Sequence, residues 1–186
     1  MPGSAFHYSL FGFNLAGAVL EKVTGVTYPQ LVRAAVFNPL GMTHSYADGE
    51  RSSNKWQSKY YETTGMENDL GDLSYKFPSG GMVSTCNDLL RFGNALIDGT
   101  ILPKPWRDSM MLSQLTTSGS STGYGMGWYT GVDIKGRTIW YHAGDSFTGS
   151  SGILIYPANR TVVTFLANSQ AGTLADLEKI AGFFLP

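Results

Sequence analysis

Two short segments of the sequence carry side chains that can exchange protons with a reacting group. Tyr8 stands between His7 and Ser9, and His142 opens the run His142-Ala143-Gly144-Asp145. A phenol and an imidazole are both used in proteins for general acid–base catalysis. Each segment alone also has an ordinary structural explanation. A tyrosine before a helix usually packs against it, and a histidine beside glycines usually lies in a turn.

Other reactive side chains give weaker signals. Cys86 stands at the start of an apolar helical pattern, which favours a small buried residue. His7 and His44 have no metal-ligand spacing with any Cys, Asp or Glu, so we expect no metal site. Residues 52–55 spell Ser-Ser-Asn-Lys, but 18 Ser and 7 Lys placed at random would give about 0.7 Ser-x-x-Lys matches. We interpret this match, in a polar loop without helical periodicity, as a coincidence.

Composition narrows the classes of protein. The chain has 186 residues, a formal net charge of −1 and 42% hydrophobic residues, typical of one folded domain. Lys and Arg form no clustered run, which argues against a nucleic-acid partner. No apolar stretch reaches the roughly 18 residues of a membrane span. The single cysteine excludes an intrachain disulfide, no signal peptide is visible, and the compartment stays unknown. The abrupt start before a motif leads us to expect that upstream sequence is missing.

The first part of the chain predicts helices and a long loop. Apolar residues recur at helical spacing over 10–23, between the N-cap candidate Ser9 and Gly25. A second helix is predicted over 28–37, because Pro39 cannot continue it. Further predictions are a helix opened by residues 84–88 and ended by Gly99, a short helix over 106–115, and a surface loop with short strands over 43–78.

The last third predicts an antiparallel sheet. Segments rich in β-branched and aromatic residues are separated by Gly, Asp, Asn or Pro. The predicted strands are 124–132, 138–141, 152–156 and 161–168, with a hairpin over 155–161 and a final helix over 174–184. The fold class is therefore α+β. We predict one domain over 1–186, mostly helical and loop over 1–120, with antiparallel strands and a C-terminal helix over 121–186.

Four segments, in sequence order, resemble the motifs of class C β-lactamases and their esterase and peptidase relatives. The match covers essentially the whole chain and looks most like the mitochondrial serine β-lactamase-like protein and its bacterial relatives. The chain is thus similar to the C-terminal portion of a penicillin-binding, β-lactamase-like serine hydrolase. The segments are the tyrosine motif within 2–17, the Gly-Gly-x-x-Ser-Thr loop and helix within 77–93, the strand at 124–128, and a His-x-Gly form of the Lys-Thr-Gly motif at 142–144.

The resemblance implies a fold and roles for four residues. It implies a β-lactamase/transpeptidase-like antiparallel sheet with flanking helices, whose N-terminal part is missing here, and chemistry without a metal or other cofactor. Tyr8 matches the tyrosine that, with a lysine from elsewhere, handles the proton of the nucleophile. His142 matches the third-motif lysine, which helps proton transfer or holds a substrate carboxylate. The backbone N–H of Asp145 matches one half of the oxyanion hole, and Gly144 would let substrate approach that edge closely.

Two departures from the family pattern matter. Leu10 stands where the tyrosine motif normally has an Asn that donates to a substrate amide oxygen, which argues against efficient penicillin turnover. The Ser-x-x-Lys motif that supplies the nucleophile lies well upstream of the tyrosine in the family, and the seven residues printed before Tyr8 do not contain it.

These points set the expected function. The parent enzyme would transfer an acyl group to serine from a small ester, peptide or β-lactam, while this chain alone would be an inactive fragment. Whether the chain is itself an enzyme is left open. The alternative is a non-catalytic binding domain that self-associates through an exposed sheet edge.

Overall fold

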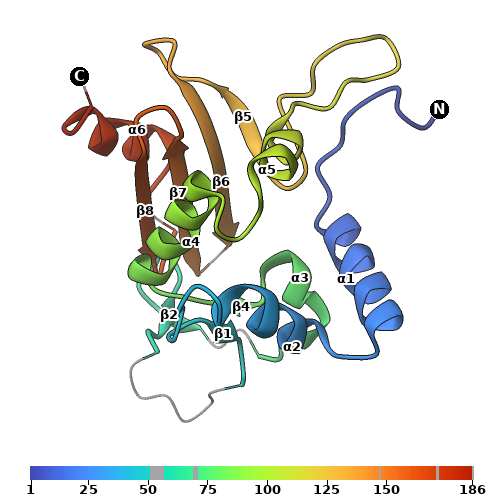
Figure 1. The fold of residues 1–186 in the computed structure, drawn as a ribbon. Helices are drawn as coiled ribbons and strands as arrows, with labels where there is room; N and C mark the ends of the chain where they lie inside the picture. Colours follow the sequence, from blue (N-terminus) through green and yellow to red (C-terminus); the bar gives the residue numbers. More distant parts are fainter. Residues whose placement is uncertain (51–56, 69–70, 147, 171, 186) are drawn as a thin grey trace.

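The computed structural model describes all residues except 51–56, 69–70, 147, 171 and 186. Helices and two short strand pairs come first, followed by a four-stranded sheet and a last helix (Figure 1). The helices are α1 (Leu10–Thr24), α2 (Tyr28–Val32), the π-helical turn Arg33–Phe37, the 3₁₀ turn Ser74–Lys76, α3 (Phe77–Gly80), α4 (Cys86–Asp98), α5 (Lys104–Met111) and α6 (Leu174–Gly182). The strands are β1 (Tyr46–Ala47), β2 (Tyr60–Tyr61), β3 (Glu67–Asn68), β4 (Met82–Val83), β5 (Tyr129–Val132), β6 (Thr138–Ser146), β7 (Gly149–Tyr156) and β8 (Thr161–Ala167).

Both ends of α1 form as the sequence predicts. The Ser9 side chain accepts a hydrogen bond from the Gly12 N–H at 3.3 Å, which satisfies one free donor of the first turn. Gly25 ends the helix with φ 73°, a conformation that costs glycine little. The second predicted helix also forms, as α2 continued by the π-helical turn that ends at Phe37.

Helix α4 joins the helical part to the sheet. The Thr85 side chain accepts a hydrogen bond from the Asp88 N–H at 3.2 Å, and Gly99 ends the helix with φ 73°. The buried Asp88 carboxylate in turn accepts from the His44 N–H at 2.9 Å and the Ser45 hydroxyl at 2.8 Å. The start of α4 is therefore fixed to the loop that follows the second helix.

The sheet is antiparallel throughout, in the order β5-β6-β7-β8. Strand β6 is longer than predicted, because its pairing with β7 continues to the pair Ser146–Gly149. The segment His142–Asp145 therefore lies inside a strand, whereas the sequence placed it at a strand end before a turn. Strand β5 is shorter than predicted and begins at Tyr129. The predicted hairpin over 155–161 is confirmed as the connection between β7 and β8.

The helix predicted over 106–115 forms, but at an earlier position in the chain. Helix α5 spans Lys104–Met111, two residues earlier at its start and four earlier at its end. Pro105 is tolerated there because the first turn needs no intrahelical N–H bond. The chain leaves the helix because Gln114 pairs instead with Tyr124, whose carbonyl accepts the Gln114 N–H at 2.8 Å.

Two apolar clusters cover the two faces of the sheet. One lies between the sheet, α4 and α5, and the other between the sheet and α6. Side chains alternate between the faces along each strand, so Trp140 belongs to the first cluster and Ile139 to the second. The first cluster is Leu96, Ile97, Met111, Trp128, Trp140, Ile153 and Ile155; the second is Ile139, Leu154, Tyr156, Val163, Leu177, Ala181 and Leu185.

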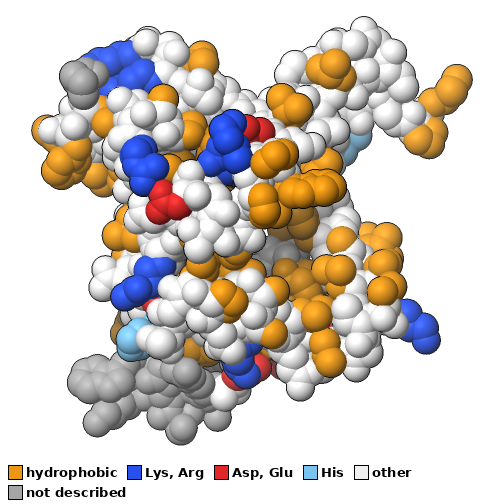
Figure 2. Space-filling view, in the orientation of Figure 1, with side chains coloured by type: hydrophobic (Ala, Val, Ile, Leu, Met, Phe, Trp, Pro, Cys, Tyr) orange, Lys and Arg blue, Asp and Glu red, His pale blue; other side chains and the backbone are white. Residues whose placement is uncertain are grey.

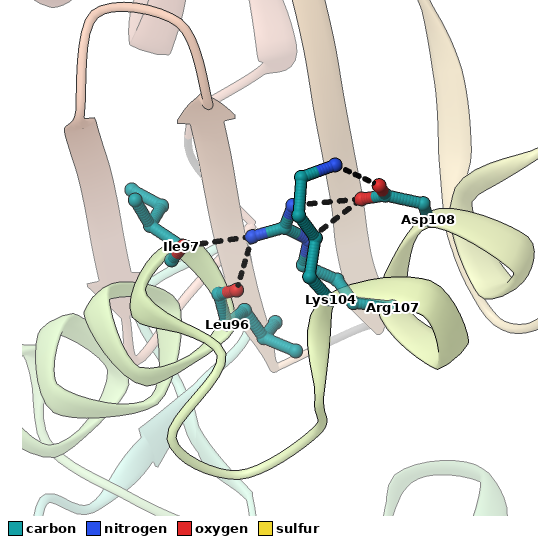
Figure 3. Close-up of polar contacts among 5 residues, drawn as sticks. All are labelled: Leu96, Ile97, Lys104, Arg107 and Asp108. Carbon is teal, nitrogen blue, oxygen red and sulfur yellow. Dashed lines mark hydrogen bonds and ion pairs between the residues drawn. The ribbon is translucent and has the colours of Figure 1, made fainter.

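Arg107 ties α5 to the end of α4 and to β6 (Figure 3). Its guanidinium donates to the carbonyl oxygens of Leu96 at 3.2 Å and Ile97 at 2.7 Å, which lie in the last turn of α4. It also pairs with Asp108 at 2.7 Å and lies 5.5 Å from the ring centroid of Trp140. One buried cation thus binds the end of one helix and packs on the strand that carries His142.

Helix α1 stands apart from the sheet and leaves an apolar stripe exposed (Figures 1 and 2). Its buried residue is Gly17, where an added Cβ would lie 2.2 Å from Pro78 Cγ. The apolar periodicity that predicts the helix therefore lies mainly on its outer side. The exposed stripe is Phe11, Leu15, Val19 and Val23.

Within the described residues, no helix combines the length and apolar character needed to cross a membrane.

Candidate functional site

The structure brings Tyr8 and His142 together. Tyr8 lies just before α1 and His142 lies on β6, yet their ring centroids are 5.9 Å apart. The Tyr8 ring also contacts Phe13, one turn into α1, at 6.0 Å between centroids. Two segments more than 130 residues apart in the sequence therefore face a common point, with 41% of Tyr8 exposed.

Two further phenols complete this cluster. Tyr124 lies between α5 and β5, and its ring centroid is 5.9 Å from Tyr8 and 6.1 Å from His142. Tyr129, the first residue of β5, lies 4.7 Å from Tyr124, 5.7 Å from His142 and 6.4 Å from Tyr8. We call Tyr8, Tyr124, Tyr129 and His142 the phenol–imidazole cluster.

Both ring nitrogens of His142 have hydrogen-bond partners. The Nε2 atom lies 3.1 Å from the Tyr124 hydroxyl, and Nδ1 lies 3.0 Å from the carbonyl oxygen of Ala143. Burial lowers the pKa of His142, and its hydrogen bond to Ala143 acts in the opposite direction. The neutral imidazole is therefore favoured near neutral pH.

Two phenols of the cluster, Tyr8 and Tyr124, are also held neutral. Burial and then the neighbouring Tyr129 raise the pKa of Tyr8. Burial, followed by the proximity of Tyr8 and Tyr129, raises the pKa of Tyr124 to about 12. In this state Tyr8 and Tyr124 offer hydroxyl donors, and the imidazole of His142 is uncharged.

Gly144 and Asp145 lie at an open edge of β6. The pairing with β5 ends at Tyr129–Tyr141, while pairing with β7 continues along the strand. Among the described residues, the β5 side of β6 beyond Tyr141 therefore has no paired strand. The Asp145 side chain is turned away from His142, since it is an odd number of residues along the strand. The role expected of Asp145 concerns its backbone N–H, and this role stays a prediction.

The other sequence candidates lie elsewhere. Leu10 is exposed as the first residue of α1. Cys86, expected to be buried, is only partly buried, because it is the first residue of α4. The His44 ring contacts the Thr43 hydroxyl at 3.1 Å. In the part of the chain that the structure describes, no group of three His, Cys, Asp or Glu could hold a metal ion. The Ser-x-x-Lys match at 52–55 lies outside the described residues.

Sequence reasoning missed Tyr124 as a site residue. The sequence predicts a strand for the segment that contains Tyr124. In the structure, Tyr124 forms one isolated bridge with Tyr129, the first residue of β5. The segment begins Tyr-Gly-Met-Gly-Trp, and an added Cβ at Gly125 would lie 2.3 Å from the Met110 carbonyl oxygen. Only glycine fits at this contact, so the glycine next to Tyr124 was a sequence signal that the backbone is tightly packed here.

A family model described as beta-lactamase matches residues 1–182. The chain belongs to the β-lactamase family. Its fold is the β-lactamase/transpeptidase-like fold, α+β with an antiparallel sheet and flanking helices, and it is partial relative to the matched structures. The family and the fold class predicted from the four motifs are thereby confirmed.

Two curated relatives illustrate the range of the family. Penicillin-binding protein 4* of Bacillus subtilis is 25% identical over 189 residues, which cover 92% of this chain and 42% of that protein. The human mitochondrial serine beta-lactamase-like protein LACTB is 32% identical over 102 residues, which cover 53% of this chain and 18% of that protein. The chain thus spans less than half the length of these relatives.

Solved structures also match nearly all of this chain, which covers only part of each of them. A D-stereospecific amidohydrolase from a Streptomyces species has a TM-score of 0.81 at 28% identity, covering 96% of this chain and 55% of that one. The octameric penicillin-binding protein homologue from Pyrococcus abyssi has a TM-score of 0.84 at 25% identity, covering 99% of this chain and 43% of that one.

Proposed function

We propose that this β-lactamase-family chain forms one side of a serine hydrolase site that accepts acyl groups from esters, peptides or lactams. The observation that carries the proposal is the 5.9 Å approach of the Tyr8 and His142 rings beside the open edge of β6. In this proposal Tyr8 handles the proton of the attacking serine, and His142 takes the place of the third-motif lysine. The Asp145 N–H contributes to the oxyanion hole, and Gly144 leaves room for substrate.

Esters and amides are the proposed substrates ahead of penicillins. His142 replaces the family's lysine, and Leu10 replaces the Asn that donates to a lactam side-chain amide. The similarity to a D-stereospecific amidohydrolase agrees with an amide or peptide substrate.

We further propose that residues 1–186 do not form an acyl-enzyme by themselves. The sequence holds one Ser-x-x-Lys match, at 52–55, which lacks the apolar helical pattern that would place the lysine one turn from the serine. The relatives extend well beyond the matched region, and the nucleophile would come from a segment of that kind. Loss of a nucleophile typically lowers turnover by about 10⁶-fold.

The test is acylation of serine, measured as a mass shift after treatment with a fluorophosphonate or a fluorescent penicillin. The chain alone should give no adduct. A fusion that adds a Ser-x-x-Lys helix of the β-lactamase family to the N-terminus of this chain should give one. Within the fusion, Tyr8→Phe should slow acylation by about 10²-fold or more.

Three controls make the outcome specific. Replacing the fusion's motif serine by Ala should abolish the adduct. Ile134→Ala, a change at a residue that is 98% exposed in the connection between β5 and β6, should not alter its rate. An adduct on the chain alone that disappears in Ser52→Ala would overturn the proposal that the loop serine is a coincidence. A fusion that acylates equally fast with and without the Tyr8 phenol would refute the role given to Tyr8.

A second candidate function is binding through self-association. Strand β8 is at the edge of the sheet and pairs with β7 on one side only. Just after β8, the Asn168 carbonyl oxygen accepts a hydrogen bond from the Tyr61 N–H at 2.9 Å. Among the described residues, no strand pairs with the outer edge of β8 itself. An open strand edge can pair with another chain. The Pyrococcus homologue is octameric, which supports the idea.

Sedimentation velocity at micromolar concentration tests this alternative. We expect a species larger than the monomer, which Leu166→Lys on β8 should dissociate by placing a charge beside the open edge. Leu112→Lys is the matched control, since it adds the same charge at an exposed site outside the sheet. A monomer at all concentrations would rule out self-association in this range.

A further inference from the structure

Tyr124 makes the one side-chain hydrogen bond to His142 among the described residues, and it is buried. A carbonyl oxygen can only accept a hydrogen bond, so the contact between Ala143 and Nδ1 requires the proton to be on Nδ1. In a neutral imidazole the other nitrogen then carries a lone pair. That nitrogen, Nε2, accepts the hydrogen bond that the Tyr124 hydroxyl donates. One tautomer satisfies both contacts.

The surroundings of His142 agree with an uncharged ring. The rings packed against it belong to Tyr8, Tyr124 and Tyr129. All three are phenols, so the cluster provides no carboxylate to stabilise an imidazolium. Asp145, on the same strand, directs its side chain to the other face, where it accepts from Ser150 at 3.4 Å.

We propose that the Tyr124 hydroxyl holds His142 as a neutral Nδ1–H imidazole with Nε2 occupied, so that the site favours acyl substrates with no carboxylate at this position. A lysine there would present a mobile cation to a carboxylate. His142 held in this way presents neither a charge nor a free donor, because its one N–H is bonded to Ala143. Tyr124 is thus a positioning residue that acts through His142. Its effect on substrate choice rests on the function proposed above.

The first test reads the ring itself and does not require activity. Long-range proton–nitrogen NMR spectra of the ¹⁵N-labelled chain near neutral pH distinguish the two tautomers and the imidazolium. His142→Gln identifies the signals against those of His7 and His44. We expect a protonated Nδ1 and an unprotonated, hydrogen-bonded Nε2. In Tyr124→Phe the Nε2 signal should move toward the position of a free imidazole nitrogen, while Nδ1 stays protonated.

Tyr129→Phe is the matched control. It removes a phenol hydroxyl from the same cluster, 5.7 Å from His142 between ring centroids, with no hydrogen bond to the imidazole in the structure. Its spectra should keep the wild-type Nε2 signal. A wild-type ring protonated at Nε2, an imidazolium near neutral pH, or an Nε2 signal unchanged in Tyr124→Phe would each overturn the proposal.

The second test uses the acylating fusion and a pair of aryl esters that differ only by a carboxylate on the acyl group. The neutral ester should be preferred by about tenfold or more in kcat/KM, and His142→Lys should reduce that preference. Equal use of both esters would refute the substrate selection while leaving the NMR result to decide the tautomer. A fusion inactive toward both esters would count against the proposed function, and the NMR result would still judge the role of Tyr124.

Discussion

Arg107 provides the sharpest test of how the fold supports β6. Replacing it with Met keeps the aliphatic stem and removes the guanidinium from a side chain that is 11% exposed. Two hydrogen bonds from a charged donor are lost, and the Leu96 and Ile97 carbonyl oxygens lose this partner at the end of α4. At about 1.5 kcal/mol net for each bond, the lower end for a charged partner, plus about 0.5 kcal/mol for the contact with Trp140, we expect a loss of about 3 to 3.5 kcal/mol.

Urea unfolding followed by tryptophan fluorescence measures this loss, since Trp128 and Trp140 both lie in the core. With a slope of about 2 kcal/mol per molar urea, the midpoint of Arg107→Met should fall by about 1.5 M at an unchanged slope.

Lys104→Met is the matched control, because Lys104 also pairs with Asp108 but is largely exposed. An exposed pair contributes about 0.5 kcal/mol or less, so this midpoint should fall by no more than about 0.3 M. Equal midpoints for the two variants would refute the claim that Arg107 anchors α5 to α4.

Three further predictions follow from the packing and from the shifted pKa values. In Gly93→Ala the new Cβ would lie 2.6 Å from Val162 Cγ1, so unfolding free energy should fall by about 1 kcal/mol even after the gain in helix propensity. Gly131→Ala, with no atom within 4 Å, should change it by less than about 0.5 kcal/mol. Because the pKa of His142 is lowered in the folded state, stability should decline as pH falls from about 6.5 through that lowered value; urea midpoints at about pH 8 and pH 5.5 should differ less in His142→Gln. Because the pKa of Tyr124 is raised from 10.0 to about 12, the stability contributed by the protonated phenol should be lost as pH rises through that interval. In a near-ultraviolet phenolate titration, Tyr124→Phe should lack part of the absorbance increase seen at the highest pH. A titration curve identical to that of the wild type would contradict the shift.

The sequence predicted the elements whose ends are determined locally. Ser9 and Gly25 bound α1, and Thr85 and Gly99 bound α4, through capping contacts that involve residues within a turn. The sequence also predicted the helical periodicity of α1, but it did not show whether the apolar face would be buried or exposed. Phe11 and its stripe are exposed, because which side of a helix is covered depends on distant chain segments.

The candidate site was only partly predictable for a similar reason. Motif spacing singled out Tyr8 and His142, whose approach depends on how α1 sits relative to β6. The bond from Tyr124 to Nε2 could not be inferred, since it depends on a turn between α5 and β5 that brings the phenol back over β6. The extension of β6 past Tyr141 was missed because its pairing comes from β7, and the sequence of β6 alone carries no signal for the end of a partner strand.

The role proposed for Tyr8 needs a nearby positive charge, which the phenol–imidazole cluster does not provide. Burial raises the pKa of Tyr8, which is the wrong direction for the role proposed for it, taking a proton from serine near neutral pH. A unit positive charge about 4 Å away lowers the pKa of a phenol by about 3 units at an effective dielectric constant of about 20. His142 does not supply that charge, since burial and the Tyr124 hydroxyl favour its neutral form. The lysine of the Ser-x-x-Lys motif in the proposed fusion would supply that positive charge. Burial, which opposes ionisation of Tyr8 in this chain, would then strengthen the attraction between the Tyr8 phenolate and the lysine ammonium. Acylation and the ionisation of Tyr8 should therefore be gained together in the fusion, and replacing that lysine by Met should remove both.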